Sequence, residues 1–437
     1  MGARWYSAVW RWHFYAGLFC MPFVLWLSVT GTIFLWKPQI EGWLDRPYDA
    51  LAITGPRASA EAQVAAALKA VPGTLHKYQL PQGPHEATRV IVASSAGDVR
   101  VYVNPYDLRV LHTIREDARP MNLVQRLHGT LLAGDRGSNL VEIAACWTIT
   151  MLLTGLYLWW PRGRRGLGGV LYPRLRSGRR IFWRDIHAVA GIWVAVFALF
   201  LITTGLPWAK FWGSYLRDMR QVTGTVDGPA DWTIGGKPAA MLGDHAEHRA
   251  MSAHAPVAGP ALDRVVAAMY GLGVAPPTMI APPAMAGAPW TVTSDAANRP
   301  LRTSITIDGA TGMLRSRRDF DARHWVDRVV GYGIAAHEGA LFGLANQILG
   351  TLTALLLATL SVSGSVLWWR RRPQGRLGAP PRRERPRAGW LLLAGLGVLA
   401  IGMPLFGATL VGMLAVDRWL LPRAPRLRIW LGLEQPA

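Results

Sequence analysis

The sequence is poor in charge for its length of 437 residues. Only 17% of its residues are charged and 51% are apolar, whereas soluble globular proteins carry about 25% charged residues. This shortage argues against a soluble globular protein and favours a membrane protein. The charge that is present is mainly basic, with 47 Lys and Arg against 27 Asp and Glu. Because the arginines lie beside long apolar runs, we interpret the basic excess as a sign of membrane topology and expect no nucleic-acid partner.

Cysteine is also scarce. The chain has two cysteines, Cys20 and Cys146, and both lie within or beside apolar segments. This excludes a disulfide framework and a CxxCH attachment site, so any heme would be held without a covalent bond, as heme b. The sequence also lacks a G-x-G-x-x-G unit between a strand and a helix, so we do not expect the chain to bind NAD(P)H or flavin.

Five apolar segments are long enough to cross about 30 Å of hydrocarbon. They are residues 14–36, 143–160, 188–208, 348–369 and 390–416. The fifth is interrupted by Gly402 and Pro404, and the sequence leaves open whether it is one kinked helix or a short re-entrant hairpin. No small-residue cleavage site follows the first segment, so we expect that segment to remain as an anchor.

The short loops after the second and fourth segments are rich in arginine. Under the positive-inside rule these loops and the N-terminus are cytoplasmic, and the two long segments face the opposite, periplasmic side. The expected membrane segments are 1–38, 139–165, 187–208, 346–369 and 390–437, the last including the tail. The expected outer domains are 39–138 and 209–345, and the expected cytoplasmic loops are 166–186 and 370–389.

Each outer segment has the pattern of a small α+β domain. In the first, a helical stretch at 59–71 precedes strand-like runs at 77–80, 88–93, 99–103 and 109–112. In the second, a helical stretch at 261–270 precedes runs at 290–293, 303–307 and 313–315, and we expect 222–260 to be loop. The predicted fold is an all-α membrane bundle of about five helices, built from tandem-duplicated two-helix units, with two small extracytoplasmic α+β domains.

Histidines recur with the same neighbours in the two halves. His13 is followed by Gly17 after four residues and by Thr30-Gly31, whose glycine lies 18 residues on. The same spacings recur at His187, Gly191 and Thr204-Gly205. His128 precedes Thr154-Gly155 and Trp159-Trp160 by 27 residues to the glycine and 32 to the second tryptophan. The second-half equivalents at the same spacings are His337, Ser363-Gly364 and Trp368-Trp369. This register predicts a tandem duplication.

Neutral imidazole is a strong axial ligand for heme iron, and an ionisable residue at membrane depth is costly unless it has a function. Glycine one turn after His13 and His187 leaves room for a porphyrin edge on the same helix face. The alternative for the small pairs is that they only let helices approach closely, but this does not explain their register with the histidines. We expect two hemes, one held by His13 and His187 near the inner face and one held by His128 and His337 near the outer face.

Other polar residues are weaker candidates. Arg11, Arg126 and Arg184 lie two or three residues before a histidine and either pair with heme propionates or serve as ordinary interfacial anchors. An H-x-x-H cluster in the second outer segment is either a metal site or part of a loop; it consists of His245, His248 and His254.

The motifs together resemble a known family. Arg11-Trp12-His13 opens a span that ends at Val29-Thr30-Gly31, the run Val101-Tyr102-Val103-Asn104-Pro105-Tyr106 forms a strand and turn, and Gly155 precedes Trp159-Trp160. Over about 4–420 the chain resembles the PepSY-associated transmembrane family, with outer domains that resemble paired PepSY modules. The resemblance implies a bacterial inner-membrane protein, and some members are diheme reductases of ferric siderophores, called iron-regulated membrane proteins. The positions that match the family's histidines are His13, His128, His187 and His337. The turn from Asp308 to Gly312 departs from the family in lacking the usual aromatic residue.

The favoured function is a diheme reductase that passes electrons outward to a ferric chelate or siderophore, with quinol or a separate reductase as the electron donor. The alternative is a heme-free membrane anchor whose PepSY-like modules bind or regulate periplasmic partners such as proteases. A metal transporter would need charged residues at mid-membrane, and the apolar segments hold almost none.

Overall fold

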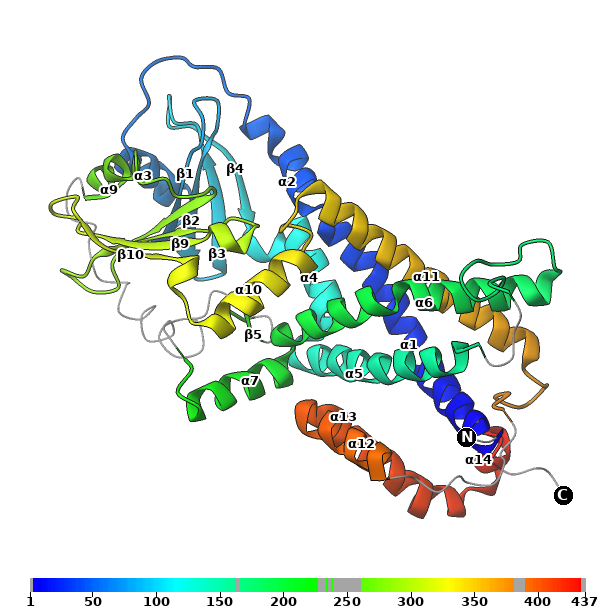
Figure 1. Cartoon of the computed structure of the whole chain (residues 1–437). Coiled ribbons are helices and arrows are strands. Elements are labelled where there is room, and N and C mark those ends of the chain that lie inside the picture. The colour runs from blue at the N-terminus through cyan, green and yellow to red at the C-terminus, as the bar shows by residue number, and fades with distance from the viewer. Residues whose placement is uncertain are drawn as a thin grey trace.

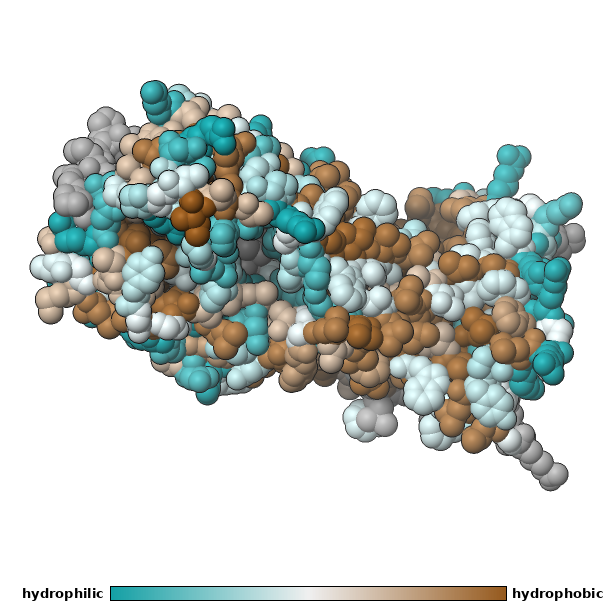
Figure 2. All heavy atoms as spheres, turned by 90° about the horizontal axis from the view of Figure 1, so that it is seen from above, coloured by the Kyte–Doolittle hydropathy of each residue, from teal (hydrophilic) through white to brown (hydrophobic). Residues whose placement is uncertain are grey.

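The computed structural model describes residues 3–161, 166–226, 233–234, 237–238, 261–380 and 390–433. Long helices form a bundle at one end of the molecule, and a β-sheet with two covering helices lies at the other (Figure 1). Apolar side chains gather over the bundle, with hydrophilic side chains at both of its ends (Figure 2). We call the two ends of the bundle sheet-proximal and sheet-distal.

Four long helices make up the bundle: α1 (Ala3–Leu35), α5 (Gly134–Trp159), α6 (Arg179–Gly205) and α11 (Leu344–Arg371). Each packs against two others, in the cyclic order α1, α5, α6 and α11. Each is long and apolar enough to cross a membrane, and in lipid a helix satisfies its own backbone hydrogen bonds. Large apolar side chains on the outside, such as Trp193 and Val196, are exposed because lipid is their solvent. The protein is therefore a multi-pass membrane protein.

The fifth apolar segment is a hairpin, which settles the choice that the sequence left open. It consists of α12 (Trp390–Gly402) and α13 (Pro404–Ala415), which pack side by side and are joined at Met403 (Figure 1). Proline at the first position of α13 and the non-helical backbone of Met403 break the helix there. Within the described residues, the stretch Pro404–Arg423 completes the set of five candidate spans. The chain then returns through η7 (Val416–Leu420), η8 (Leu421–Arg423) and α14 (Pro425–Trp430) to the sheet-distal end.

The strands of both outer segments form one antiparallel sheet of eight strands, in the order β10-β9-β8-β7-β1-β2-β3-β4. The first segment supplies β1 (Thr74–Leu80), β2 (Thr88–Ser94), β3 (Gly97–Val103) and β4 (Val110–Arg115). The second supplies β7 (Thr278–Ala281), β8 (Trp290–Ser294), β9 (Thr303–Ile307) and β10 (Leu314–Asp319). Pairing of β1 with β7, with Tyr78 opposite Ile280, joins the two sets. The segments therefore share one sheet, which the sequence did not predict. A separate two-stranded sheet contains β5 (Thr233–Ile234) and β6 (Lys237–Pro238).

One face of the large sheet packs against α3 (Ala60–Ala70) and α9 (Ala261–Met269). Alternate strand residues point to this face because side chains in a strand alternate sides; Val90, Val92, Val292 and Ile305 are fully buried there. The two helices also cap one another. Asp263 of α9 accepts a hydrogen bond from the backbone N–H of Ala60 (2.6 Å), and Glu61 of α3 accepts one from Leu262 (3.1 Å). This exchange places an acid at each helix N-terminus, where the helix dipole favours it.

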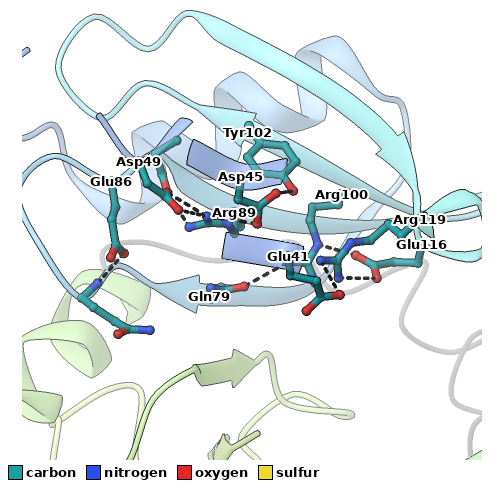
Figure 3. A network of polar contacts seen from close by, with 12 residues as sticks. Glu41, Asp45, Asp49, Gln79, Glu86, Arg89, Arg100, Tyr102, Glu116 and Arg119 are labelled. Atoms are coloured by element: carbon teal, nitrogen blue, oxygen red, sulfur yellow. Dashed lines mark hydrogen bonds and ion pairs between the residues drawn. The ribbon is translucent and has the colours of Figure 1, made fainter. Parts of the chain in front are cut away.

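Short helices join the sheet to the bundle. The two edge strands, β4 and β10, lead through the single turns η2 (Glu116–Ala118) and η6 (Phe320–Ala322) into α4 (Pro120–Thr130) and α10 (Trp325–His337). On the first side, α1 continues past Trp36 into α2 (Lys37–Asp45), followed by η1 (Arg46–Tyr48). Buried Arg89 of β2 binds Asp49 at 2.7 Å and Asp45 of α2 at 3.2 Å, and Tyr102 of β3 donates to Asp45 (Figure 3). These contacts fix α2 against the sheet.

On the second side, α7 (Lys210–Val222) and its preceding turn η3 (Leu206–Trp208) follow α6. Arg220 of α7 and Asp327 of α10 form a bidentate ion pair at 2.6 and 2.8 Å, with both side chains about nine-tenths buried. Replacing Asp327 by alanine is expected to cost about 3–5 kcal/mol, because Arg220 would be left as a buried charge without its carboxylate. Thermal unfolding in detergent measures this loss.

The matched control is Asp218→Ala, which removes the exposed partner of Arg217 on the same helix and is expected to change stability by less than about 1 kcal/mol. Equal effects of the two substitutions would contradict the importance of the buried pair.

Candidate functional site

His13 of α1 and His187 of α6 lie next to one another inside the bundle, at its sheet-distal end. Their ring centres are 6.3 Å apart and the rings are inclined by 78°. Two imidazoles on one metal ion would have ring centres roughly 6 Å apart, from about 2 Å per metal–nitrogen bond and about 1 Å from nitrogen to ring centre on each side. The spacing of the ring centres is therefore compatible with two imidazole ligands on one metal ion.

A cavity of about 1080 Å³ surrounds this pair. Its lining includes both histidines and the predicted small residues Gly17 and Gly191. A methyl group on Gly17 would have Met151 3.8 Å away as its nearest neighbour, and one on Gly191 would have Leu360 at 3.7 Å. The walls are mainly aliphatic and aromatic, as in most cofactor sites. The cavity can hold a flat group of porphyrin size beside the two imidazoles.

The cavity also reaches five arginines: Arg179, Arg180, Arg184, Arg370 and Arg371. Guanidinium groups at this position suit the carboxylates of an anionic cofactor. Of the three arginines that the sequence singled out, Arg184 lies here. The other four belong to the arginine-rich loops and helix ends, for which the sequence predicted only a role in membrane topology.

Arg11 and Arg126 are engaged elsewhere. Arg11 donates hydrogen bonds to the carbonyls of Pro380 and Gly432 and to the hydroxyl of Tyr15, so it holds the C-terminal segment against α1. Arg126 donates to the carbonyl of Asp117 at 3.2 Å. Neither lines the cavity. Both arginines therefore contact other parts of the protein, and neither faces the cavity at His13 and His187.

His128 and His337 form the sheet-proximal pair, near the ends of α4 and α10. Burial lowers the pKa of His128 to about 4, and burial together with the nearby His128 lowers the pKa of His337 to about 4. Both are therefore neutral at pH 7, which is the form that donates a lone pair to a metal. Trp208 packs edge-on against His337, with ring centres 5.6 Å apart. The two edge strands of the sheet thus lead directly to the two helices that carry this pair.

Each histidine packs on the glycine of a small-residue pair on a neighbouring helix. A methyl group on Gly155 would lie 3.1 Å from Cε1 of His13, and one on Gly31 would lie 3.1 Å from Cε1 of His128. In the second half, a methyl group on Gly364 would lie 3.4 Å from Cε1 of His187, and one on Gly205 would lie 3.3 Å from Cε1 of His337. The structure thus places the glycine of each Ser/Thr-Gly pair against a histidine ring. An added methyl group would be tighter than ordinary contact at Gly155, Gly31 and Gly205, and it would require the ring to shift by a few tenths of an ångström.

The cluster of His245, His248 and His254 lies outside the described residues. Within the described part of the chain, no group of three or more His, Cys, Asp or Glu side chains could hold a metal ion. His324 is the N-cap residue of α10, where its Nδ1 accepts a hydrogen bond from Val326.

Residues 10–371 match the family model described as the PepSY-associated TM region, and this match includes all four paired histidines. Among curated proteins, no sequence matches the chain. The match covers well over half of the chain, and we conclude that the protein belongs to the PepSY-associated transmembrane family.

Proposed function

We propose that this protein is a b-type diheme oxidoreductase of the bacterial inner membrane that carries electrons outward to a ferric chelate of the siderophore class. The observation that carries the proposal is the separation of 6.3 Å between the rings of His13 and His187 inside a cavity of about 1080 Å³. Bound heme b would supply one-electron iron chemistry. Lacking CxxCH, the chain can hold heme only through such side-chain ligands.

The residues around the sheet-distal pair have distinct roles in this proposal. His13 and His187 would hold the heme iron, and Gly17 and Gly191 would leave room for the macrocycle one helical turn away. The arginines at the cavity would bind the heme carboxylates. Apolar residues such as Leu152 and Leu360, which line the cavity, keep water from the iron. A dry, fixed environment lowers the reorganisation that accompanies each electron transfer.

His128 and His337 would hold the second heme. Along α1 the two histidine levels are separated by 18 residues, from His13 to Gly31, or roughly 27 Å at about 1.5 Å per residue. This is close to the hydrocarbon thickness of about 30 Å, so two hemes at these levels would give the electron a two-step route across the bilayer.

The arginine-rich loops at the sheet-distal end favour placing that end in the cytoplasm and the sheet in the periplasm. We infer that the two halves arose by tandem duplication, since each supplies a span, a helix that covers the large sheet, four strands of that sheet and a second span in the same order. Each outer half would then be a PepSY-like module. The electron donor is quinol or a separate reductase, and reduction loosens the chelate because hard oxygen ligands bind trivalent iron better.

The visible spectrum of the purified protein tests the proposal. We expect a strong Soret band, a sharp α-band after dithionite reduction, and two hemes per chain by extraction. The reduced protein should then be reoxidised by a ferric siderophore and not by the matching gallium complex, which has the same charge and shape but accepts no electron.

A preparation without heme, made with the cofactor supplied during expression, would contradict the proposal. That result would favour the alternative, a heme-free anchor whose outer modules bind periplasmic partners.

A further inference from the structure

A hydroxyl group lies beside one ring nitrogen of each paired histidine. Thr154 Oγ1 is 3.1 Å from Nδ1 of His13, and Thr30 Oγ1 is 3.0 Å from Nδ1 of His128. In the second half, Ser363 Oγ is 3.0 Å from Nδ1 of His187, and Thr204 Oγ1 is 3.0 Å from Nδ1 of His337. Each hydroxyl belongs to the residue directly before the glycine on which the same ring packs. The Ser/Thr-Gly pair therefore contacts two adjacent atoms of one imidazole.

The direction of these hydrogen bonds follows from the hydroxyl's single proton. Thr30 donates it to the carbonyl of Trp26 at 2.9 Å, as threonine commonly does within a helix. Thr154 and Thr204 donate in the same way, to Thr150 at 2.8 Å and Phe200 at 2.7 Å, and Ser363 donates to Leu360 at 3.2 Å. When the hydroxyl proton is given to the backbone carbonyl in this way, the hydroxyl oxygen accepts from the ring, and this arrangement favours the ring proton on Nδ1.

This arrangement favours one tautomer and one orientation of each ring. A neutral imidazole with its proton on Nδ1 has its lone pair on Nε2. The hydroxyl and the glycine hold the Nδ1–Cε1 edge of the ring against the neighbouring helix, and this leaves the lone pair of Nε2 outside that contact. For His13 the carbonyl of Met151 is a second acceptor, 3.0 Å from Nδ1.

On the basis of the heme sites proposed above, we propose that these four hydroxyls are positioning residues that act through the histidines. They accept the Nδ1 proton, hold Nε2 toward the iron, and raise the basicity of the ligand. The four positions are Thr30, Thr154, Thr204 and Ser363. They act in two sets, Thr30 with Thr204 on the sheet-proximal heme and Thr154 with Ser363 on the sheet-distal heme.

The double substitution Thr30→Val and Thr204→Val tests the proposal, because valine keeps the shape of threonine and removes the acceptor. Outer-shell hydrogen bonds to ligating histidines are typically worth 10–100-fold in metal affinity. We expect the sheet-proximal heme to dissociate about 10–100-fold faster. Its reduction potential should rise, because a less basic ligand stabilises ferric iron less. The potential and spectrum of the other heme should not change.

The chain offers matched controls two residues and one residue away. Thr32 and Thr203 donate to backbone carbonyls of the same helices, at 2.8 and 2.9 Å, and no hydrogen bond from either to a histidine is found in the described structure. Thr32→Val with Thr203→Val should leave both hemes unchanged. Thr30→Ser with Thr204→Ser should restore the wild-type potential, which a purely steric role would not do. For the sheet-distal heme, the equivalent pair is Thr154→Val with Ser363→Ala.

Two failures can be told apart. A wild-type protein that binds no heme would overturn the proposed function. A wild-type protein with two hemes whose potentials and dissociation rates are the same in the Thr30/Thr204 valine variant would overturn the positioning role alone. A shift of both hemes together would also overturn the assignment of the hydroxyls to separate sets.

Discussion

Replacing His13 by alanine is expected to remove one heme per chain and to stop electron transfer to an external ferric chelate. The substitution leaves one axial ligand at the sheet-distal site, where the ring of His187 lies 6.3 Å from that of His13. Low-spin heme absorbance should fall by half. The rate of reoxidation through the bilayer should fall by at least about 10³-fold, because the electron route needs both hemes and the variant lacks one of them. Proteoliposomes with donor inside and ferric chelate outside measure the second effect.

Paired substitutions decide which histidines share a heme. If His13 and His187 ligate the same iron, His13→Ala with His187→Ala should lose no more heme than either single variant, because residues that act as one unit are not additive. His13→Ala with His128→Ala should lose both hemes. Pairing within one half, His13 with His128, predicts the reverse pattern.

The control for surface effects is His85→Ala, since His85 is exposed in the outer segment and its Nδ1 donates a hydrogen bond to the carbonyl of Leu51. It should keep both hemes and the full transfer rate. Full occupancy by two low-spin hemes in His13→Ala would contradict the assignment of His13 as a ligand.

The membrane bundle and the depth of the histidines could be predicted from sequence because their signals are local. Charge-free apolar runs of span length predict the membrane helices. The interval of 18 residues from His13 to Gly31 predicts that these two residues lie at different depths along the same helix. The structure adds that Gly31 touches the ring of His128. A spacing of 18 residues shows that two positions are at different depths, but it does not show which side chains touch.

The single sheet was not predicted because its central pairing is long-range. Tyr78 of β1 lies opposite Ile280 of β7, about two hundred residues later in the chain. The strand β7 is only four residues long (Thr278–Ala281), too short for an alternating pattern to stand out. Sequence patterns indicated most of the other strands in each segment, but nothing local indicates that their edges meet.

The arginines show a second limit of prediction from the sequence. Arg11 was a reasonable candidate because it precedes His13 by two residues, yet its guanidinium contacts the C-terminal segment near Gly432. Arg371 is 358 residues from His13 along the chain and lines the same cavity. Proximity in sequence does not predict which atoms a long, flexible arginine side chain contacts. In an arginine-rich loop, an arginine that lines a binding site also cannot be distinguished by sequence from one that only determines membrane topology.

Replacing Gly137 by alanine is expected to disrupt the sheet-proximal site selectively. A methyl group on Gly137 would lie 1.7 Å from the carbonyl oxygen of Thr130, two residues after His128, and 2.6 Å from the carbonyl carbon. Both are backbone atoms, so no side chain can rotate away. The loop between α4 and α5 has little freedom to relax, because Leu131 and Leu132 already have positive φ angles of 50° and 59°. Such conformations cost about 1–2 kcal/mol for a residue with a Cβ.

We expect Gly137→Ala to cost more than about 3 kcal/mol and to move the end of α4, and with it His128. The sheet-proximal heme should be lost or become high-spin, while the heme at His13 and His187 should stay. The control is Gly129→Ala, next to His128 itself, where an added methyl group meets nothing within 4 Å and the better helix propensity of alanine should be neutral or slightly stabilising. Heme content, spin state by visible spectroscopy and thermal unfolding of the two variants measure the difference. If Gly129→Ala lost the heme and Gly137→Ala kept it, the tight α4–α5 junction would not be what holds His128 in place.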